Sequence, residues 1–332
     1  MSKQIINNKV LIQPSPVLSF AFAKGMLIHM RPYLMFISGV AGLAGMALAS
    51  EVALEYAAFA ILFLPFFLGY GFGQALTDCF QIDTDAISSP YRPLVKGEIS
   101  VRSVLVVSLL GLLGIGAVLI SFNLNNILWA VLTIAGLATY TYFKKNFWFA
   151  GPFYNAWIVM LLPIMGYMVV SGTDLQSVWG QKLYQLMGLS FFSYANFVLI
   201  GYLKDITADR SSGYHTFPVR FGWDAAVWVG DAFALLGIVF CWLAIQPYEL
   251  NVSLLAFVAA SIIAIAGQLY AHLTKIKKEE NSAFPISATV RSFILWHIAV
   301  ILAYRPNWLL FCLAFYLLFE CVLFFRPEKN QI

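Results

Sequence analysis

Charged residues are scarce in this chain. Asp, Glu, Lys and Arg make up 11% of the 332 residues, whereas 61% are hydrophobic and the mean hydropathy is +0.80. A soluble globular domain carries about a quarter charged residues. The composition therefore excludes an ordinary soluble domain and predicts an all-α polytopic membrane protein.

Cysteine and polar linker segments are sparse as well. The four cysteines show no CxxC spacing, so they are interpreted as packing residues rather than as a metal site or redox pair. No segment is long or polar enough to divide the chain, and one membrane domain over residues 1–332 is expected. The N-terminal stretch lacks the apolar core and cleavage pattern of a secretory signal. No nucleic-acid partner is expected.

Ten apolar runs approach the ~20 residues that a helix needs to cross a bilayer. They lie at 33–50, 54–76, 102–122, 125–143, 153–171, 184–203, 223–246, 251–274, 287–303 and 307–325. The run at 287–303 is the weakest because it carries Arg291 and His297. The bundle over 33–325 therefore has nine spans if this run is re-entrant and ten if it crosses. Residues 17–30 are expected to form an interfacial helix that leads into the first span.

The basic residues predict the orientation of the chain. With ten spans and the N-terminus inside, every Lys and Arg except Lys182, Arg291 and Arg305 falls on the cytoplasmic side, as the positive-inside rule requires. With nine spans only the C-terminal tail changes side. We therefore expect segment 1–32 and the loops at 77–101 and 204–222 to face the cytoplasm.

Two acidic clusters stand out against this apolar background. Residues 77–85 follow the second run and residues 204–209 follow the sixth. A charge within the hydrocarbon costs roughly 2.5–3.5 kcal/mol, so carboxylates at its edge are expected to face a cavity and hold cations. Hard oxygen ligands favour Mg²⁺, which a few carboxylates hold together with water and substrate phosphate. The alternative interpretation is that each cluster is a solvated loop with helix-capping Asp residues. The occurrence of two clusters at matching positions favours the metal site over this alternative.

The spacing within each cluster indicates which side chains share a face. If the helix of the second run continues, positions i, i+4, i+7 and i+11 form one stripe. These positions hold Gln74, Asp78, Gln81 and Asp85. Asp83 joins the stripe only if the backbone unwinds there. Asp205 and Asp209, at i and i+4, repel each other unless a cation is bound. The predicted metal ligands are Asp78, Gln81, Asp83, Asp85, Asp205 and Asp209.

Basic residues in the same loops supply the counter-charge for a diphosphate. Arg92 lies between two prolines that restrict the local backbone, and its guanidinium fork suits phosphate oxygens. Lys145 is interpreted as part of the positive-inside signal instead. Tyr140 and Tyr142 are expected to face a carbocation, which ring faces stabilise without attacking it. The predicted substrate-binding residues are Arg92, Lys96, Tyr140, Lys144, Lys204 and Arg210.

Together these segments resemble the UbiA-type intramembrane prenyltransferase superfamily over nearly the whole chain. The match rests on 78–85 followed by 90–100 (PYRPLVKGEIS), on 140–144 (YTYFK) and on 205–222. The 90–100 string is most similar to the chlorophyll synthase and homogentisate prenyltransferase branches. The chain departs from the usual motifs in three places, with Thr77 for Asn and Gln81 for Asp in the first, and Tyr202 where many relatives have an acid in the second.

The resemblance implies nine membrane helices around a central lateral cavity, and two Asp-rich motifs that bind Mg²⁺ and an isoprenyl diphosphate. It also implies transfer of the prenyl chain to a lipophilic, often aromatic, acceptor within the membrane. The residues expected to be catalytic are Asp78, Arg92, Lys144 and Asp205.

Two other functions stay open at this point. A terpene cyclase on the same scaffold would capture the cation with a double bond of the substrate itself, and the altered first motif is compatible with this. A transporter or lipid-binding membrane protein would use the acids for ion coupling. The transporter hypothesis is disfavoured because the ion sites of transporters lie near the bilayer midplane, whereas these acids stand at the ends of the apolar runs.

Overall fold

The computed structural model describes residues 13–49, 56–246 and 252–326. Within these ranges the chain is helical and forms no strand. Nine helices of the described part are long and apolar enough to cross a membrane, or ten if the bent pair α1–α2 counts as one span. The predicted all-α membrane architecture is confirmed. Residues 1–12 of the expected N-terminal segment, and the expected run ends at 50, 54–55 and 251, lie outside the described residues.

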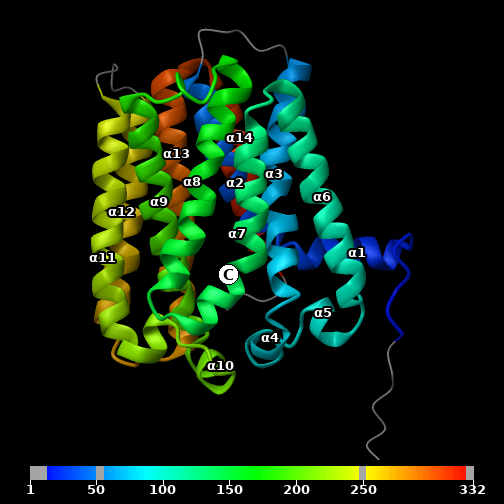
Figure 1. Cartoon of the computed structure of the whole chain (residues 1–332). Helices are drawn as coiled ribbons and strands as arrows, with labels where there is room; N and C mark the ends of the chain where they lie inside the picture. The colour runs from blue at the N-terminus through cyan, green and yellow to red at the C-terminus, as the bar shows by residue number, and fades with distance from the viewer. Residues whose placement is uncertain (1–12, 50–55, 247–251, 327–332) are drawn as a thin grey trace, which may run out of the picture.

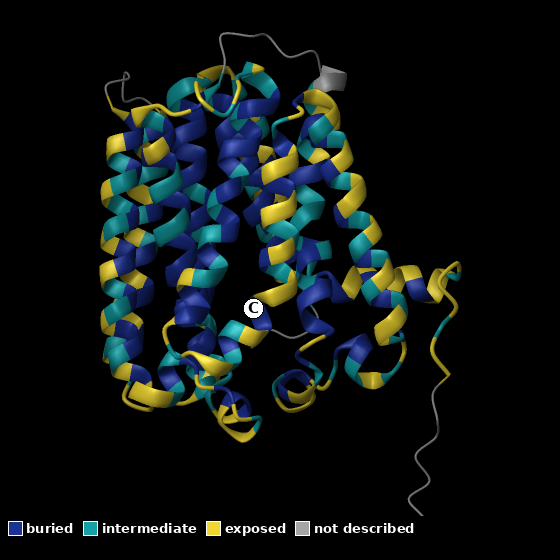
Figure 2. Cartoon of the chain, in the orientation of Figure 1, coloured by how far each residue is buried: buried dark blue, intermediate teal, exposed yellow. Residues whose placement is uncertain are grey.

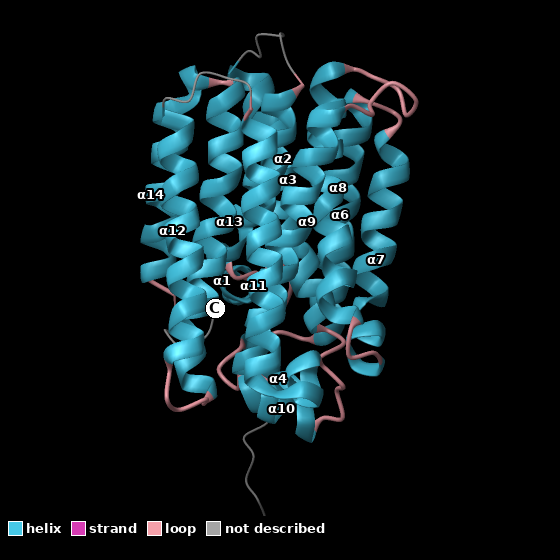
Figure 3. Cartoon of the chain, turned by 90° about the vertical axis from the view of Figure 1, so that its left-hand side faces the viewer, coloured by secondary structure: helices cyan, strands magenta, loops and turns pink. Residues whose placement is uncertain are grey.

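The long helices pack as a bundle with their axes roughly parallel (Figures 1 and 3). They are α2 (Pro32–Leu48), α3 (Tyr56–Asp78), α6 (Val101–Phe122), α7 (Asn126–Asn146), α8 (Ala150–Ser171), α9 (Gln181–Gly201), α11 (Phe217–Ile245), α12 (Val252–Leu273), α13 (Ala283–Tyr304) and α14 (Leu309–Phe324). The short elements are α1 (Phe20–His29), α4 (Ile82–Ser88), α5 (Pro93–Lys96), α10 (Ile206–Ser211) and the 3₁₀ turns η1 (Tyr202–Lys204), η2 (Glu279–Ser282) and η3 (Pro306–Trp308). Helices α4, α5 and α10 lie together at the lower end of the bundle in Figure 1.

A sharp bend separates α1 from the first long helix. The axes of α1 and α2 differ by 64°, which confirms that a short helix leads into the first run; its contact with the bilayer interface stays a prediction. Arg31 stands at the bend with φ 53°, the only positive φ of a non-glycine residue in the described ranges. Pro32 follows at the first helical position, where its fixed φ favours helix initiation.

The run that looked weakest in the sequence forms a deeply buried helix of the bundle. Helix α13 has 22 residues, and 89% of its apolar window is buried. Its polar residues find partners on neighbouring helices, as buried charges in a membrane must. Arg291 donates two hydrogen bonds of 2.7 and 2.8 Å to Glu320 of α14, and His297 shares one of 2.8 Å with Ser190 of α9. The re-entrant alternative is therefore wrong. Figure 2 shows the buried interior of the bundle and the exposed outer faces of α6 and α11.

Helices α2 and α8 cross so closely that only glycine fits at the contact. A Cβ atom added at Gly45 would lie 2.1 Å from the carbonyl oxygen of Pro163. One added at Gly166 would lie 2.2 Å from the carbonyl oxygen of Gly42. Small residues permit this backbone approach in membrane bundles, where packing replaces the hydrophobic driving force.

We expect Gly45→Ala and Gly166→Ala each to destabilise the bundle by about 1–3 kcal/mol, because the added methyl group overpacks a backbone contact. Gly114→Ala in α6 is the matched control, since no described atom lies within 4 Å of its added Cβ. Thermal unfolding in detergent measures the difference. Equal unfolding temperatures for Gly45→Ala and Gly114→Ala would contradict the close crossing.

Candidate active site

A cavity opens at the end of the bundle where α4 and α10 lie. Its mouth is polar, and its interior, which extends along α6 and α7, is apolar. The charged and amide side chains that line it are Arg31, Gln74, Asp78, Gln81, Asp85, Arg92, Lys144, Asn155, Lys204 and Asp205. The apolar lining includes Leu112, Ile115, Leu119, Ile134 and Leu137. A cavity with a charged mouth and an apolar interior suits an amphiphilic ligand, whose polar end it orients.

The first acidic cluster does not continue the helix before it. Helix α3 ends at Asp78 and α4 begins at Ile82, so the predicted continuous helix is wrong here. In the turn between them, the N–H groups of residues 79, 80 and 81 donate to carbonyls three residues earlier, at 3.3, 3.0 and 3.1 Å. Side chains three residues apart eclipse in such 3₁₀-type geometry. Asp78 and Gln81 therefore still share the cavity wall, as the stripe predicted.

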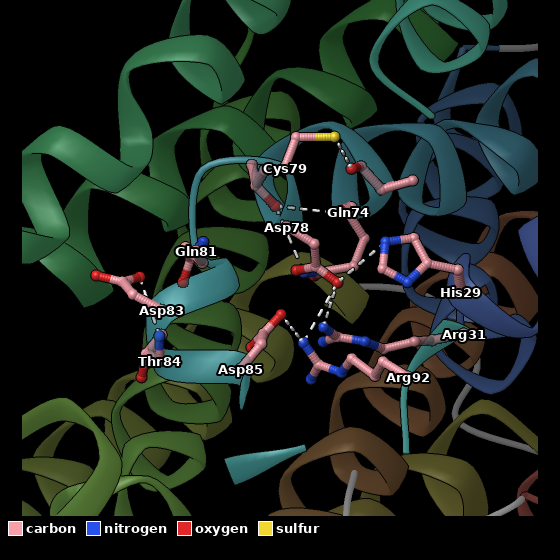
Figure 4. A network of polar contacts seen from close by, with 12 residues as sticks. His29, Arg31, Gln74, Asp78, Cys79, Gln81, Asp83, Thr84, Asp85 and Arg92 are labelled. Atoms are coloured by element: carbon pink, nitrogen blue, oxygen red, sulfur yellow. Dashed lines mark hydrogen bonds and ion pairs between the residues drawn. The ribbon is translucent and has the colours of Figure 1, made fainter. Parts of the chain in front are cut away.

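Asp78 is buried, and both of its carboxylate oxygens are engaged (Figure 4). Oδ1 accepts from Nε2 of Gln74 at 2.6 Å. Oδ2 accepts from Nη2 of Arg31 at 2.7 Å and from Nη1 of Arg92 at 3.4 Å. Arg31 was not among the predicted site residues and was expected only to lie on the cytoplasmic side. The available signal was its position directly before Pro32, at the start of the first span.

Arg92 links the two carboxylates of the first loop. Besides its contact with Asp78, Nη1 of Arg92 donates a short hydrogen bond to Oδ2 of Asp85. Burial raises the pKa of the Asp85 carboxyl to about 6, against the opposing effect of the Arg92 guanidinium. Arg92 adopts φ −64° and ψ 138°, the extended conformation that a following proline favours, and Pro93 opens α5. The proline-flanked arginine thus lies inside the site, where it was predicted.

The second acidic cluster faces the first across the mouth. Asp205 lines the cavity, and its buried Oδ1 atom has no hydrogen-bond partner within the described part of the chain. Asp209 is fully buried and accepts from Oγ1 of Thr216 at 3.1 Å; burial raises the pKa of its carboxyl. Oγ1 of Thr84, on α4, donates to Asp209 at 3.3 Å. The two loops, more than a hundred residues apart in the sequence, are in direct contact.

Lys144 connects both clusters with the tyrosines behind them. Its Nζ atom donates to Oε1 of Gln81 at 3.2 Å, lies 3.4 Å from Asp209 and stands 5.1 Å from the ring centre of Tyr202. The hydroxyl groups of Tyr140 and Tyr202 share a hydrogen bond of 2.7 Å. Both residues of the predicted Tyr140–Lys144 pair therefore line the cavity.

Four residues predicted to contact the ligand, Asp83, Lys96, Asp209 and Arg210, do not line this cavity. The Asp83 side chain is 48% exposed, because the turn before α4 places it on the outer side of that helix. Lys96 lies at the end of α5 and pairs with Glu98 at 3.7 Å, both about half exposed. Arg210 follows Asp209 on α10 and is exposed. Asp209 is fully buried beside Lys144, behind the cavity lining. The lining of the cavity does not support direct ligand contact by these four residues.

Among the described residues, no three His, Cys, Asp or Glu side chains converge closely enough to hold a metal ion by themselves. Arg92 stands between the carboxylates of the first loop, and Lys144 stands beside Asp209. The carboxylates are thus neutralised by basic side chains. A metal ion held here needs further ligands from a second molecule, which is the usual arrangement for Mg²⁺ and phosphate oxygens.

A multi-pass helical bundle with such a cavity is the architecture of an intramembrane enzyme that acts on amphiphilic substrates. Residues 38–298 match the UbiA prenyltransferase family. The chain belongs to this family, and it is an integral multi-pass membrane protein and a prenyltransferase. The resemblance seen in the sequence motifs is confirmed.

Relatives with assigned names fall into more than one branch of the family. Digeranylgeranylglyceryl phosphate synthase of Thermococcus kodakarensis is 28% identical over 217 residues, which is 65% of this chain and 76% of that protein. Chloroplastic chlorophyll synthase of Avena sativa is 30% identical over 171 residues, which is 48% of this chain and 43% of that protein. The chain is therefore similar to both without being assigned to either.

Solved structures of UbiA homologues share the fold. One from Aeropyrum pernix K1 superposes with a TM-score of 0.68 at 18% identity, covering 80% of this chain and 97% of the homologue. One from Archaeoglobus fulgidus, bound to GPP and Mg²⁺, gives a TM-score of 0.61 at 19% identity, covering 83% and 99%. At these identities the likeness establishes the architecture of the bundle.

Proposed function

We propose that this protein transfers a prenyl group from an allylic isoprenyl diphosphate to a lipophilic acceptor within the membrane, with Mg²⁺ as cofactor. The observation that carries the proposal is the cavity itself, in which both acidic clusters and several basic side chains surround one end of an apolar space. The Archaeoglobus fulgidus homologue, solved with GPP and Mg²⁺, supports this choice of donor and metal. The positive-inside pattern supports a cytoplasmic position for the mouth.

The residues present fit Mg²⁺. Asp205 offers a buried carboxylate oxygen that accepts no hydrogen bond from the described residues. Burial raises the pKa of Asp85 to about 6, so additional positive charge nearby would stabilise its ionised form. When bound, Mg²⁺ neutralises the diphosphate and improves it as a leaving group. We assign metal binding to Asp78, Gln81, Asp85 and Asp205, which line the cavity, and not to Asp83. Asp209, buried 3.4 Å from Nζ of Lys144, positions that lysine at the mouth instead.

The basic residues of the mouth bind the diphosphate in this proposal. Arg31 and Arg92 both reach Asp78, and binding of the donor would turn their guanidinium groups toward its phosphate oxygens. Cleavage of the donor C1–O bond leaves the electron pair on a diphosphate oxygen. Arg92, Lys144 and Lys204 stabilise the charge that develops there.

The interior of the cavity stabilises the other product of this cleavage. The rings of Tyr140 and Tyr202 lie beside Lys144 at the boundary between the polar and apolar lining. Ring faces at this position stabilise an allylic cation. The apolar side chains of α6 and α7 receive the prenyl chain. A nucleophilic atom of the acceptor then bonds to C1 and gives up a proton.

The chemical class of the acceptor has two candidates. The sequence motifs favour an aromatic acceptor, whereas the name of the Thermococcus kodakarensis relative points to a glyceryl phosphate lipid. Acceptor-free cyclisation is not favoured, because the matching family is described as one of prenyltransferases. Diphosphate release from an allylic diphosphate by the purified protein tests the donor and the metal. Release that persists unchanged after chelation of Mg²⁺ would contradict the proposal.

We expect Gln81→Asp to lower the Mg²⁺ concentration needed for half-maximal activity by about tenfold, equivalent to about 1.4 kcal/mol. The reason is that Gln81 lines the cavity, and a carboxylate there restores a stronger oxygen ligand. A Mg²⁺ titration of activity measures the change. Asp224→Asn, which changes an exposed acid on α11, is the control and should leave the Mg²⁺ requirement unaltered. An unchanged Mg²⁺ requirement in Gln81→Asp would contradict the assignment of Gln81 to the metal.

A further inference from the structure

Asp83 joins three chain segments on the outer side of the cavity mouth. Its Oδ1 atom accepts from the hydroxyl of Tyr214 at 3.3 Å, and its Oδ2 atom accepts from Nζ of Lys145 at 3.2 Å. Tyr214 follows α10, and Lys145 lies at the end of α7. One carboxylate therefore links the α4 loop to segments 131 and 62 residues away in the sequence.

The partners of Asp83 are themselves firmly held. The Tyr214 ring is 1% exposed and has ammonium groups near it, with Nζ of Lys144 at 5.0 Å and Nζ of Lys145 at 4.8 Å from its centre. The backbone N–H of Tyr214 donates to the carbonyl of Asp209 at 2.8 Å, and that of His215 donates to the carbonyl of Lys145 at 3.0 Å. Asp83 thus attaches α4 to a rigid support.

Helix α4 is a wall of the cavity on its inner side. Thr84 and Asp85 line the cavity, while Asp83 points away from it, as Figure 4 shows. The contacts of Asp83 hold the outer side of α4, while Thr84 and Asp85 hold its inner side through Asp209 and Arg92. A half-exposed ion pair contributes little to the overall free energy of unfolding. Loss of the Asp83–Lys145 pair should therefore change the closure of the mouth rather than the stability of the bundle.

We propose that Asp83, Tyr214 and Lys145 form a clasp that holds α4 closed over the mouth and keeps water away from the reacting carbon. The inference rests on the proposed function. Asp83 is a positioning residue in this account, since it touches neither donor nor metal. Exclusion of water matters because a water oxygen can bond to C1 of the allylic cation in place of the acceptor and then lose a proton. The product of that side reaction is a prenyl alcohol, formed after the diphosphate has left with the electrons of the C–O bond.

The test compares the products of Asp83→Ala, Tyr214→Phe and the double variant in the full-length protein. Each sample contains geranylgeranyl diphosphate, Mg²⁺ and either a lipophilic phenol or a glyceryl phosphate ether lipid as acceptor. We expect the ratio of prenyl alcohol to prenylated acceptor to rise at least threefold in each single variant. The double variant should show no more than the larger single effect, because both changes open the same contact. Tyr214→Phe removes a single hydroxyl and guards against misfolding. Glu98→Gln is the matched control, since it breaks the Lys96–Glu98 pair of similar exposure.

A ratio equal to wild type in both single variants would overturn the clasp. Amide hydrogen exchange over residues 82–88 provides a second readout that needs no turnover. Faster exchange in Asp83→Ala than in Glu98→Gln supports closure by the clasp, and equal exchange contradicts it. A wild-type protein that releases no diphosphate would refute the proposed function instead, and the exchange measurement would still decide the clasp.

Discussion

Replacement of Asp205 by Asn is expected to lower prenyl transfer by a factor on the order of 10³, the effect of removing a preorganised charge at the reacting group. The substitution keeps the shape of the side chain. It removes no hydrogen bond to Oδ1, because that oxygen accepts none from the described residues. The loss should therefore appear in turnover and not in folding.

The measurement pairs product formation with thermal unfolding of the same preparation. Asp224→Asn is the matched control: Asp224 is an exposed acid on α11 that pairs with Lys277 at 3.2 Å, away from the cavity. Its activity should equal that of wild type. Turnover retained in Asp205→Asn would count against metal binding by the second acidic cluster.

Arg92→Met is expected to weaken both the fold and the binding of the donor. Arg92 is the cation that Asp85 contacts, and it also approaches Asp78, so its removal leaves buried negative charge uncompensated. Loss of one partner of a buried ion pair costs about 3–5 kcal/mol. The free energy of unfolding should fall by an amount of this order, and binding of the allylic diphosphate should fall with it.

The pH dependence of the stability lost in Arg92→Met identifies the cause of that loss. Burial already raises the pKa of Asp85 to about 6, so the folded protein retains a proton there more readily than the unfolded chain. Arg92 opposes this rise, so its removal moves the pKa of Asp85 still higher. The variant therefore relieves the burial penalty by taking up a proton at a pH above 6, whereas wild type does so only near 6. The stability difference between wild type and Arg92→Met should shrink as the pH falls toward about 6 and stay constant below it. Arg210→Met, an exposed arginine outside the cavity, serves as control. A pH-independent difference would contradict this explanation.

The sequence predicted the bundle and the core of the site because both depend on strong local signals. Long apolar runs define membrane helices almost regardless of context. The acidic clusters stood out because a membrane chain retains few charges. Asp78, Asp85 and Asp205 are found in the cavity for this reason, together with Arg92 and Lys144.

The errors arose where tertiary contacts override a local pattern. Asp83 was expected to reach the ligand face if the helix unwound before it; the helix does break at 79–81, but the turn sets Asp83 on the outer side of α4. Arg31 carries no motif, and only the packing of α2 beside α3 brings it to Asp78. Arg291 made α13 look weak, because the sequence does not show that Glu320 of α14 neutralises it.

Product analysis with and without acceptor is the direct test of whether this protein transfers a prenyl group to an acceptor in a Mg²⁺-dependent reaction. Purified protein is incubated with Mg²⁺ and an allylic diphosphate of about twenty carbons, and the lipid extract is examined by mass spectrometry. One sample lacks acceptor, a second contains a lipophilic phenol, and a third contains a glyceryl phosphate ether lipid. We expect a prenylated acceptor in the second or third sample. This product should be missing when Mg²⁺ is left out and when Asp205→Asn replaces the wild-type protein. A cyclic hydrocarbon or terpene alcohol as the main product of the acceptor-free sample, with no prenylated acceptor in the others, would contradict the proposed function.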